Sequence, residues 1–193
     1  MRKPLSEGNI SVSCFGSSSS SLPSHILKDA YRLGYLIGQE GWSQFNGAGR
    51  NGVMGALTDG GKDAGGQVHG IIIEAYEHYK HSRLDSCESA GDFNKRKARL
   101  IEEGDFIVCL PGGVGTLSEL MHAVDDQLVE LYYKRKKLPP VILLNTHGYY
   151  TGLFNWIKDV VVQAGALKSE SFEDLFVIVQ SAEEAVRYIK ERI

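Results

Sequence analysis

Short β-branched apolar runs alternate with longer stretches of helical periodicity along the whole chain, and no other feature constrains the fold as strongly. The run 106–110 is almost wholly apolar, which is typical of a strand covered on both faces. Strands that alternate with helices predict a mostly parallel sheet with helices on both faces, joined by right-handed crossovers. The sequence therefore predicts an α/β fold, a Rossmann-like doubly wound sheet in a single domain over residues 1–193.

The same pattern places the individual elements. Strands are predicted at 9–15, 42–45, 68–73, 106–110, 141–145 and 175–179. Helices are predicted at 22–40, within 47–64, and at 93–103, 115–130, 151–164 and 181–193. Ser181 is the expected N-cap of the last helix, with Glu184 at the capping-box position. The polar stretch 74–92 is interpreted as a loop with some helix.

Charge and composition narrow the function classes. The 193 residues carry 21 Lys and Arg against 24 Asp and Glu, a net charge of −3, which argues against nucleic-acid binding by bulk charge. No window approaches the roughly 20 apolar residues of a membrane span, and no signal peptide is visible. We therefore expect a cytoplasmic protein with neither a membrane nor a nucleic-acid partner. The three cysteines form no CxxC pair, and no metal site is expected.

The strongest local feature is the stretch Leu110–Glu119, which follows the apolar strand and opens a helix. Glycines there let a ligand approach the backbone, and free N–H groups at a helix N-terminus attract an anion. Thr116 adds a hydroxyl, and Glu119 lies one turn further on the same helix face. The Glu119 carboxylate and a bound phosphate are both negative and repel each other. Glu119 is therefore expected to contact a part of the ligand other than its phosphate. The alternative is a tight turn followed by a surface glutamate.

Two earlier turns are weaker candidates. The loop Gly47–Gly55 fits GxGxxG at only three glycines and follows the second strand, so its glycines, Gly49 among them, either contact the ligand or shape the pocket floor. In a doubly wound sheet the first strand neighbours the strand 106–110 at the point where ligands bind. That order would place Ser17 and Ser18 beside the turn Gly112–Thr116. The alternative for the serines is a solvated turn.

Basic residues cluster in the predicted helix 93–103. Arg96 and Arg99 share one face of this helix, with Lys97 about a quarter turn away, so these cations can supply charge to a bound phosphate. The alternative is a solvated basic face. A second run, Lys134–Lys137, ends a helix, where cations are favoured in any case.

At Pro111–Glu119, together with Arg96-Lys97, the chain resembles the LONELY GUY type of phosphoribohydrolases, long labelled "possible lysine decarboxylases". That family carries PGGxGTxxE, an upstream Arg-Lys pair in a helix, a GGGxxGLMG-like loop and an early CGSS-like turn. The resemblance covers roughly residues 10–190. Counterparts of the four motifs occur in this chain, in order along the sequence from the early turn to the last motif, at Gly16–Ser18, Gly47–Gly55, Arg96-Lys97 and Pro111–Glu119. The stretch Gly148–Tyr150 matches a further part of the family.

The resemblance implies hydrolysis of the N-glycosidic bond of a nucleoside 5′-monophosphate, such as a cytokinin riboside 5′-monophosphate or AMP, by a homodimer. It implies no metal and no redox cofactor. The catalytic residues would be Glu119 and Arg96. The substrate-binding residues would be Lys97, Gly112, Gly113, Val114, Gly115, Thr116, Ser17, Ser18 and Gly49.

The chain departs from the family at positions that shape the base pocket. Phe93-Asn94 replaces a Met-His pair, Ile73 replaces a proline, and Ser118 replaces the first of two glutamates. The identity of the base therefore stays open. Two other function classes remain: a nucleotide-binding carrier or sensor without turnover, and a nucleic-acid-associated protein using the two basic runs.

Overall fold

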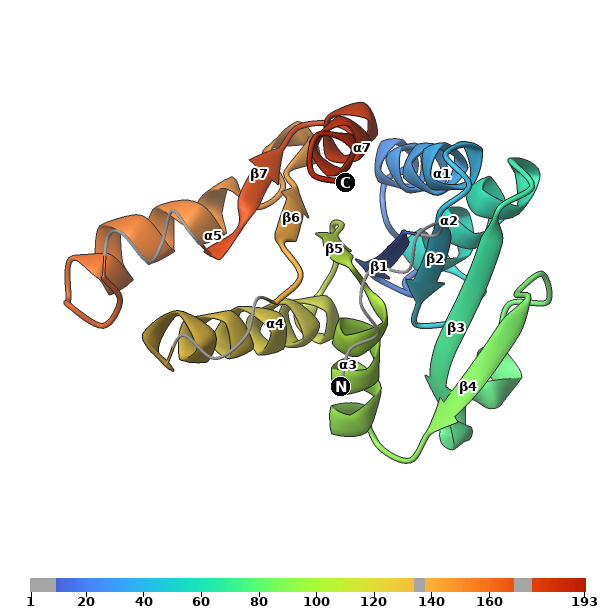
Figure 1. The fold of residues 1–193 in the computed structure, drawn as a ribbon, viewed down its shortest axis with the longest axis horizontal. Helices are drawn as coiled ribbons and strands as arrows, with labels where there is room; N and C mark the ends of the chain where they lie inside the picture. The colour runs from blue at the N-terminus through green and yellow to red at the C-terminus, as the bar shows by residue number, and fades with distance from the viewer. Residues whose placement is uncertain (1–9, 134–137, 169–174) are drawn as a thin grey trace.

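A computed structural model describes residues 10–133, 138–168 and 175–193 (Figure 1). Seven strands form one sheet in the order β4-β3-β2-β1-β5-β6-β7, and every neighbouring pair is parallel. The strands are β1 (Ser11–Phe15), β2 (Ser43–Asn46), β3 (Gln67–Ile73), β4 (Ser86–Ala90), β5 (Phe106–Cys109), β6 (Val141–Leu144) and β7 (Val177–Val179).

Helices connect and cover these strands. The α-helices are α1 (Ser24–Gln39), α2 (Gly52–Asp63), α3 (Phe93–Glu103), α4 (Val114–Tyr133), α5 (Thr151–Trp156) and α7 (Ala182–Lys190). The shorter helical segments are η1 (Glu74–Tyr79), η2 (Thr146–Gly148) and η3 (Ile157–Val162). Among the described residues, no helix is both long and apolar enough to cross a bilayer.

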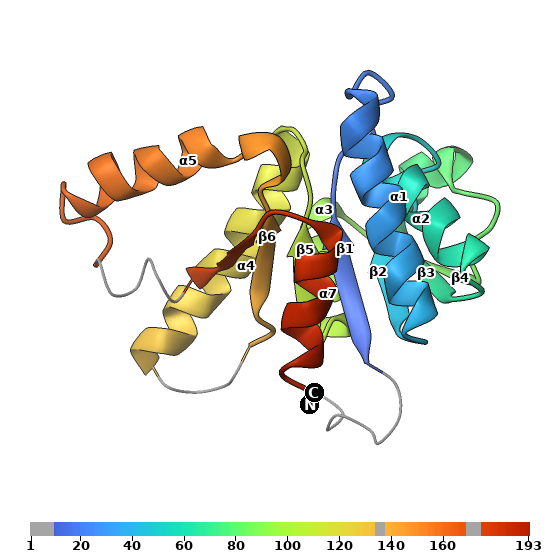
Figure 2. The ribbon, with the colours of Figure 1, turned by 90° about the horizontal axis from the view of Figure 1, so that it is seen from above.

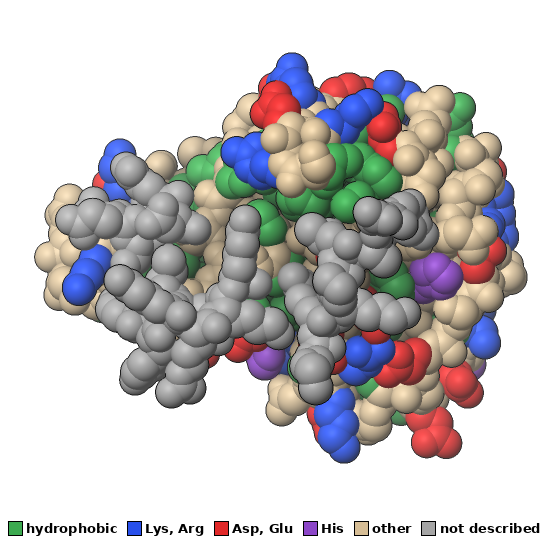
Figure 3. Space-filling model, viewed as in Figure 1, with side chains coloured by type: hydrophobic (Ala, Val, Ile, Leu, Met, Phe, Trp, Pro, Cys, Tyr) green, Lys and Arg blue, Asp and Glu red, His purple; other side chains and the backbone are tan. Residues whose placement is uncertain are grey.

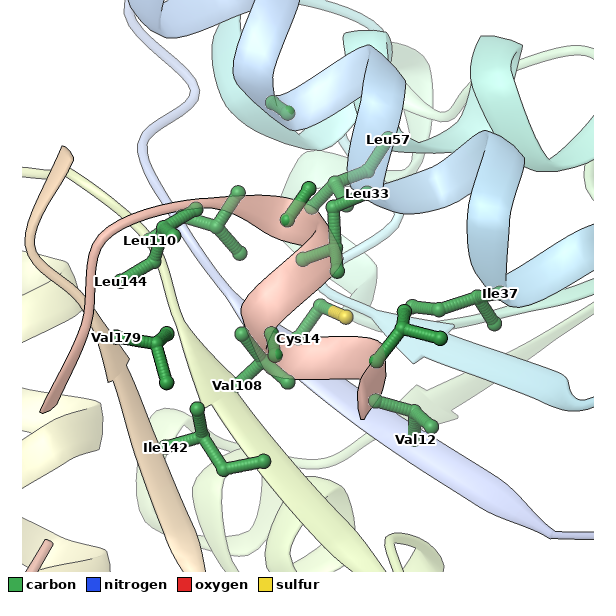
Figure 4. Packing of buried hydrophobic residues seen from close by; sticks show 14 of the residues in the cluster. Val12, Cys14, Leu33, Ile37, Leu57, Val108, Leu110, Ile142, Leu144 and Val179 are labelled. Atoms are coloured by element: carbon green, nitrogen blue, oxygen red, sulfur yellow. The ribbon is translucent and has the colours of Figure 1, made fainter. Parts of the chain in front are cut away.

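The two faces of the sheet are covered by different helices. Apolar residues of α1, α2 and α7 form one buried cluster with the sheet, and those of α3, α4 and α5 form another. Figure 4 shows the first cluster, in which the strand residues Val12, Val108 and Ile142 take part together with Leu33 and Ile37 of α1. Seen from above, α1 and α7 run side by side over the sheet (Figure 2). The predicted doubly wound architecture is therefore confirmed.

The strand order reverses between β1 and β5. The chain passes outward from β1 to β4 at one edge, and then outward from β5 to β7 at the other. Phe15 at the end of β1 pairs with Cys109 at the end of β5, and the N–H of Leu110 donates to the oxygen of Phe15 at 2.9 Å. The turns that follow these two strands therefore meet at the carboxyl edge of the sheet, where open α/β sheets bind ligands.

Two segments differ from the sequence prediction. Residues Ser86–Ala90, expected within a loop, form the edge strand β4. Its sequence SCESA lacks β-branched and aromatic residues, and most of it is not buried, so no apolar alternation revealed it. The predicted helix 151–164 continues from α5 into the π-helical η3.

At α7, Ser181 caps the helix as predicted, but the Glu184 carboxylate accepts from the N–H of Gln180 rather than from that of Ser181.

Candidate active site

A cavity of about 460 Å³ opens at the carboxyl edge of the sheet, between the turn after β1, the glycine loop before α2 and the start of α4. Its lining combines charged side chains and glycine backbone with apolar and aromatic side chains. The lining residues are Ser18, Gly47, Gly49, Arg50, Asn51, Met54, Ile72, Ile73, Tyr76, Tyr79, Phe93, Arg96, Gly115 and Glu119.

Two of the lining residues form a buried ion pair. Nη1 of Arg96 donates to Oε1 of Glu119 at 2.7 Å, and the side chains are only 12% and 9% exposed. Nε of Arg96 donates to the carbonyl oxygen of Ile71 at 2.9 Å, which fixes the guanidinium against the end of β3. The alternative interpretation of Glu119 as a surface carboxylate is therefore wrong.

Helix α3 and the glycine loop together position Arg96. Asp92 caps α3, with its carboxylate accepting from the N–H groups of Asn94 and Lys95, so the helix begins just before the arginine. Gly47 lies directly against the guanidinium, because a Cβ built there would stand 1.9 Å from Nη2 of Arg96. Any larger residue at position 47 would displace the arginine. This loop therefore acts on the site through Arg96 as well as by lining the cavity.

Burial sets the protonation behaviour of Glu119. The loss of solvent raises the pKa of its carboxyl above the usual range. The positive charge and the hydrogen bond of Arg96 oppose this rise, and so does the charge of Lys97. The charged form of Glu119 thus depends on Arg96. A carboxylate held in this way can face a developing positive charge inside the cavity.

The start of α4 presents unpartnered donors beside this pair. The carbonyl oxygen of Gly113 accepts the first helical bond, from the N–H of Leu117 at 3.0 Å. The N–H groups of residues 113–116 therefore precede the helical ladder, and none has a hydrogen-bond partner among the described residues. A Cβ at Gly113 or Gly115 would meet nothing within 4 Å, so the space beside both is open. Such a helix start favours an anion.

In the other glycine loop, two N–H groups at the start of α2 already have an acceptor. The N–H groups of Val53 and Met54, at the start of α2, both point to the carbonyl oxygen of Ser17, at 2.8 and 3.3 Å. Gly49 and Ser18 line the cavity, as the sequence predicted, whereas the Ser17 hydroxyl accepts from the N–H of Ser19 and stabilises the turn. The start of α4 thus offers four consecutive free N–H groups among the described residues, and the loop before α2 lines the cavity.

The basic helix contributes one cation to the cavity. Arg99 instead pairs with Glu88, Glu102 and Glu103 on the surface, so its predicted role near a phosphate is wrong. Lys97 donates to the Ser118 hydroxyl at 3.2 Å and does not line the cavity. On the face shown in Figure 3, Lys and Arg lie among Asp and Glu rather than in one basic region. The run Lys134–Lys137 lies outside the described residues.

Three aromatic side chains in the cavity wall were not among the predicted site residues. The ring of Tyr76 lies 5.9 Å from that of Phe93 and 6.2 Å from that of Tyr79, and all three rings are about half exposed. The backbone N–H of Arg50 donates to the carbonyl oxygen of Tyr79 at 2.9 Å, which connects η1 to the glycine loop. The replacement of the family's methionine by Phe93 was the one signal for this wall in the sequence.

Comparisons with known proteins show the family of this chain. The family described as "Possible lysine decarboxylase" matches residues 54–189. A cytokinin riboside 5′-monophosphate phosphoribohydrolase of Arabidopsis thaliana is 30% identical over 94% of this chain and 81% of its own. The enzyme of that name from Mycobacterium tuberculosis is 28% identical over 86% and 87%. The one from Rhodococcoides fascians is 34% identical, and this chain spans 58% of its length.

Solved structures extend the comparison to the whole fold. The molybdenum cofactor binding protein of Rippkaea orientalis superposes with a TM-score of 0.71 and 29% identity, covering 99% of this chain and 98% of its own. The molybdenum cofactor carrier protein of Chlamydomonas reinhardtii, at 19% identity and a TM-score of 0.69, shares the fold. With the family match over residues 54–189 and the near full-length relatives, the chain belongs to the LONELY GUY family, the one described as "Possible lysine decarboxylase".

Proposed function

We propose that the protein hydrolyses the N-glycosidic bond of a nucleoside 5′-monophosphate, releasing the free base and ribose 5-phosphate. One observation carries the proposal: a buried carboxylate–guanidinium pair and an unpartnered helix N-terminus open into the same cavity. The distance of one helical turn between Gly115 and Glu119 suits a phosphate at one end of a ribose and the reacting carbon at the other. The phosphoribohydrolase names of the relatives support this reaction class.

The start of α4, Glu119 and Arg96 have different roles in the proposed reaction. The N–H groups of Gly113–Thr116 hold the 5′-phosphate, and Glu119 faces the ribose. Cleavage passes through an oxocarbenium-like state, in which positive charge develops on the sugar. The Glu119 carboxylate stabilises that charge, holds ribose hydroxyls and orients the attacking water. Arg96 assists the departing base or fixes the substrate. The mechanism uses no metal and no redox cofactor.

The aromatic wall suits the base. Tyr76, Tyr79 and Phe93 offer flat apolar surface in the wall of the same cavity. We expect Phe93→Ala to raise KM for nucleoside monophosphates about tenfold and to change kcat little, because base–aromatic stacking contributes about 1–3 kcal/mol. Tyr31→Ala removes a partly exposed aromatic ring outside the cavity and serves as control. Steady-state kinetics with an unchanged KM for Phe93→Ala would contradict a base subsite here.

The direct test is a panel of purine and pyrimidine nucleoside 5′-monophosphates, incubated with the protein and analysed by chromatography. The proposal predicts that at least one of them yields free base and ribose 5-phosphate in equal amounts. Release of inorganic phosphate in place of base would contradict it.

The phosphate end gives a separate prediction. Gly115→Ala places a methyl group in the open space beside the helix start, so we expect KM for the nucleotide to rise at least tenfold. The matching nucleoside should be a poor substrate of the unaltered protein, because the donors at the helix start then bind nothing. Gly152→Ala, where a Cβ also meets nothing within 4 Å, is the matched control. Equal turnover of nucleoside and nucleotide would exclude this phosphate site.

A second candidate function is a carrier that binds its ligand without turnover. The molybdenum cofactor binding protein of Rippkaea orientalis resembles this chain over 99% of the residues of this chain. Ser118, in place of a family glutamate, also gives this candidate weight. Chromatography separates the two functions, because a carrier returns the bound nucleotide intact.

We further propose that the protein is a homodimer. Helices α4 and α5, the latter continued by η3, extend well beyond the sheet in Figures 1 and 2. They carry exposed apolar side chains at Met121, Val129, Trp156 and Val160. Sedimentation should give close to twice the 21.3 kDa mass of one chain. Trp156→Glu should shift the protein to monomer, whereas Phe93→Glu, outside this surface, should not. A monomer at micromolar concentration would contradict the proposal.

A further inference from the structure

We infer that the Tyr149 hydroxyl is a positioning group that aims the N–H of Gly113 at the bound phosphate. The inference deepens the proposed function, because it rests on the anion site at the start of α4. Two adjacent tyrosines after β6 donate to carbonyl oxygens on either side of Pro111. Oη of Tyr150 donates to the oxygen of Leu110 at 2.6 Å, and Oη of Tyr149 to the oxygen of Gly112 at 3.0 Å.

The geometry of the peptide bond links the Tyr149 contact to the direction of the Gly113 N–H group. The carbonyl of Gly112 and the N–H of Gly113 belong to one peptide group, and the described part of the chain contains no cis peptide. In a trans peptide these two groups point in opposite directions. Since Tyr149 holds the carbonyl on one side, the N–H of Gly113 must point to the other. No described residue accepts from that N–H, and the space beside Gly113 is open.

This peptide needs such a contact more than its neighbours do. It joins two glycines, and glycine adopts both signs of φ with little steric cost, so rotation of the peptide plane is easy in an isolated turn. The hydrogen bond from Tyr149 favours one of the available orientations before the ligand arrives. Without it, part of the binding free energy would be used to order the donor.

Tyr150 provides an internal control of the same chemistry. It holds the carbonyl of the peptide before Pro111, and proline has no N–H for that contact to orient. The residue is 3% exposed, and its Oη also lies 3.6 Å from Sγ of Cys109. Burial raises the pKa of its hydroxyl, which therefore stays protonated. Tyr150 thus stabilises the path of the chain, whereas Tyr149, 41% exposed, orients a donor.

The test compares Tyr149→Phe with Tyr150→Phe by calorimetric titration with two probes, ribose 5-phosphate and adenosine. For Tyr149→Phe we expect the affinity for ribose 5-phosphate to fall about fivefold to tenfold, as for the loss of one hydrogen bond. The affinity for adenosine and the Tm should stay unchanged. For Tyr150→Phe we expect a lower Tm, with affinities for both probes within about twofold of the original, since no donor is misdirected.

Two results would overturn the inference. Unchanged affinity of Tyr149→Phe for ribose 5-phosphate would show that the hydroxyl does not set the donor. An equal loss for adenosine would show a general disturbance of the cavity. The test measures binding, so its result does not depend on turnover. If the unaltered protein releases no base, the hydrolase proposal is contradicted, but the comparison of Tyr149→Phe with Tyr150→Phe still tests the role of the Tyr149 hydroxyl. In kinetics, the effect of Tyr149→Phe should appear in KM rather than in kcat.

Discussion

Replacement of Glu119 by Gln is expected to lower kcat by about 10²-fold or more, comparable with the loss of one preorganised electrostatic group. Glutamine keeps the shape of the side chain, and its amide oxygen still accepts from Arg96, so the fold should be retained. The substitution removes the negative charge. That charge matters most when positive charge has developed on the ribose, so substrate binding should change far less than the rate.

Steady-state kinetics on the purified variant would measure this effect, with circular dichroism confirming the fold. Glu102→Gln is the matched control, since Glu102 is an exposed carboxylate that pairs with Arg99 on the surface. It should turn over substrate at close to the original rate. Near-normal turnover by Glu119→Gln would exclude this carboxylate from the chemical step.

The second large effect is expected for Arg96→Ala, with a loss of about 10²-fold in kcat/KM, because a hydrogen bond between charged groups contributes about 1.5–3 kcal/mol and Glu119 loses its partner. The pH dependence should change as well. Burial raises the Glu119 pKa and Arg96 opposes that rise, so removal of the guanidinium raises this pKa further. The active form is the carboxylate. The rate should therefore begin to fall at a higher pH on the acid side of the profile.

Arg99→Ala is the matched control for this variant. It removes a cation from the same helix, but one that pairs with carboxylates outside the cavity. The combination Arg96→Ala with Glu119→Gln should be less damaging than the product of the two single losses, because both side chains act on one step. An acid limb that stays in place in Arg96→Ala would show that the two groups are not coupled.

Much of the fold was predictable because its inner strands are strongly patterned. The run 106–110 is apolar throughout, and β5 is buried at every position. The turn Pro111–Gly115 then identified the start of α4. The strand β4 was not predictable in the same way, since an exposed edge strand of small and polar residues needs no hydrophobic alternation. Its pairing with β3 depends on the rest of the sheet.

The site was predictable in its residue types but not in its contacts. Arg96 and Glu119 both stood out, yet their ion pair depends on how α3 and α4 pack on the sheet. Tyr76 and Tyr79 lie in η1, within the weakly patterned segment 74–92, and their place in the cavity wall depends on the contact of η1 with the loop before α2. Likewise, nothing in the sequence connected Tyr149 with a carbonyl 37 residues earlier.

The most direct test of the central claim is product analysis with the unaltered protein and Glu119→Gln side by side. A nucleoside 5′-monophosphate from the panel is incubated with each, and free base, ribose 5-phosphate and inorganic phosphate are quantified. The proposed function predicts base and ribose 5-phosphate in a one-to-one ratio from the unaltered protein, and about 10²-fold slower formation of both from Glu119→Gln. Recovery of the intact nucleotide from the unaltered protein, bound but unchanged, would contradict the hydrolase and leave the carrier as the function of this cavity.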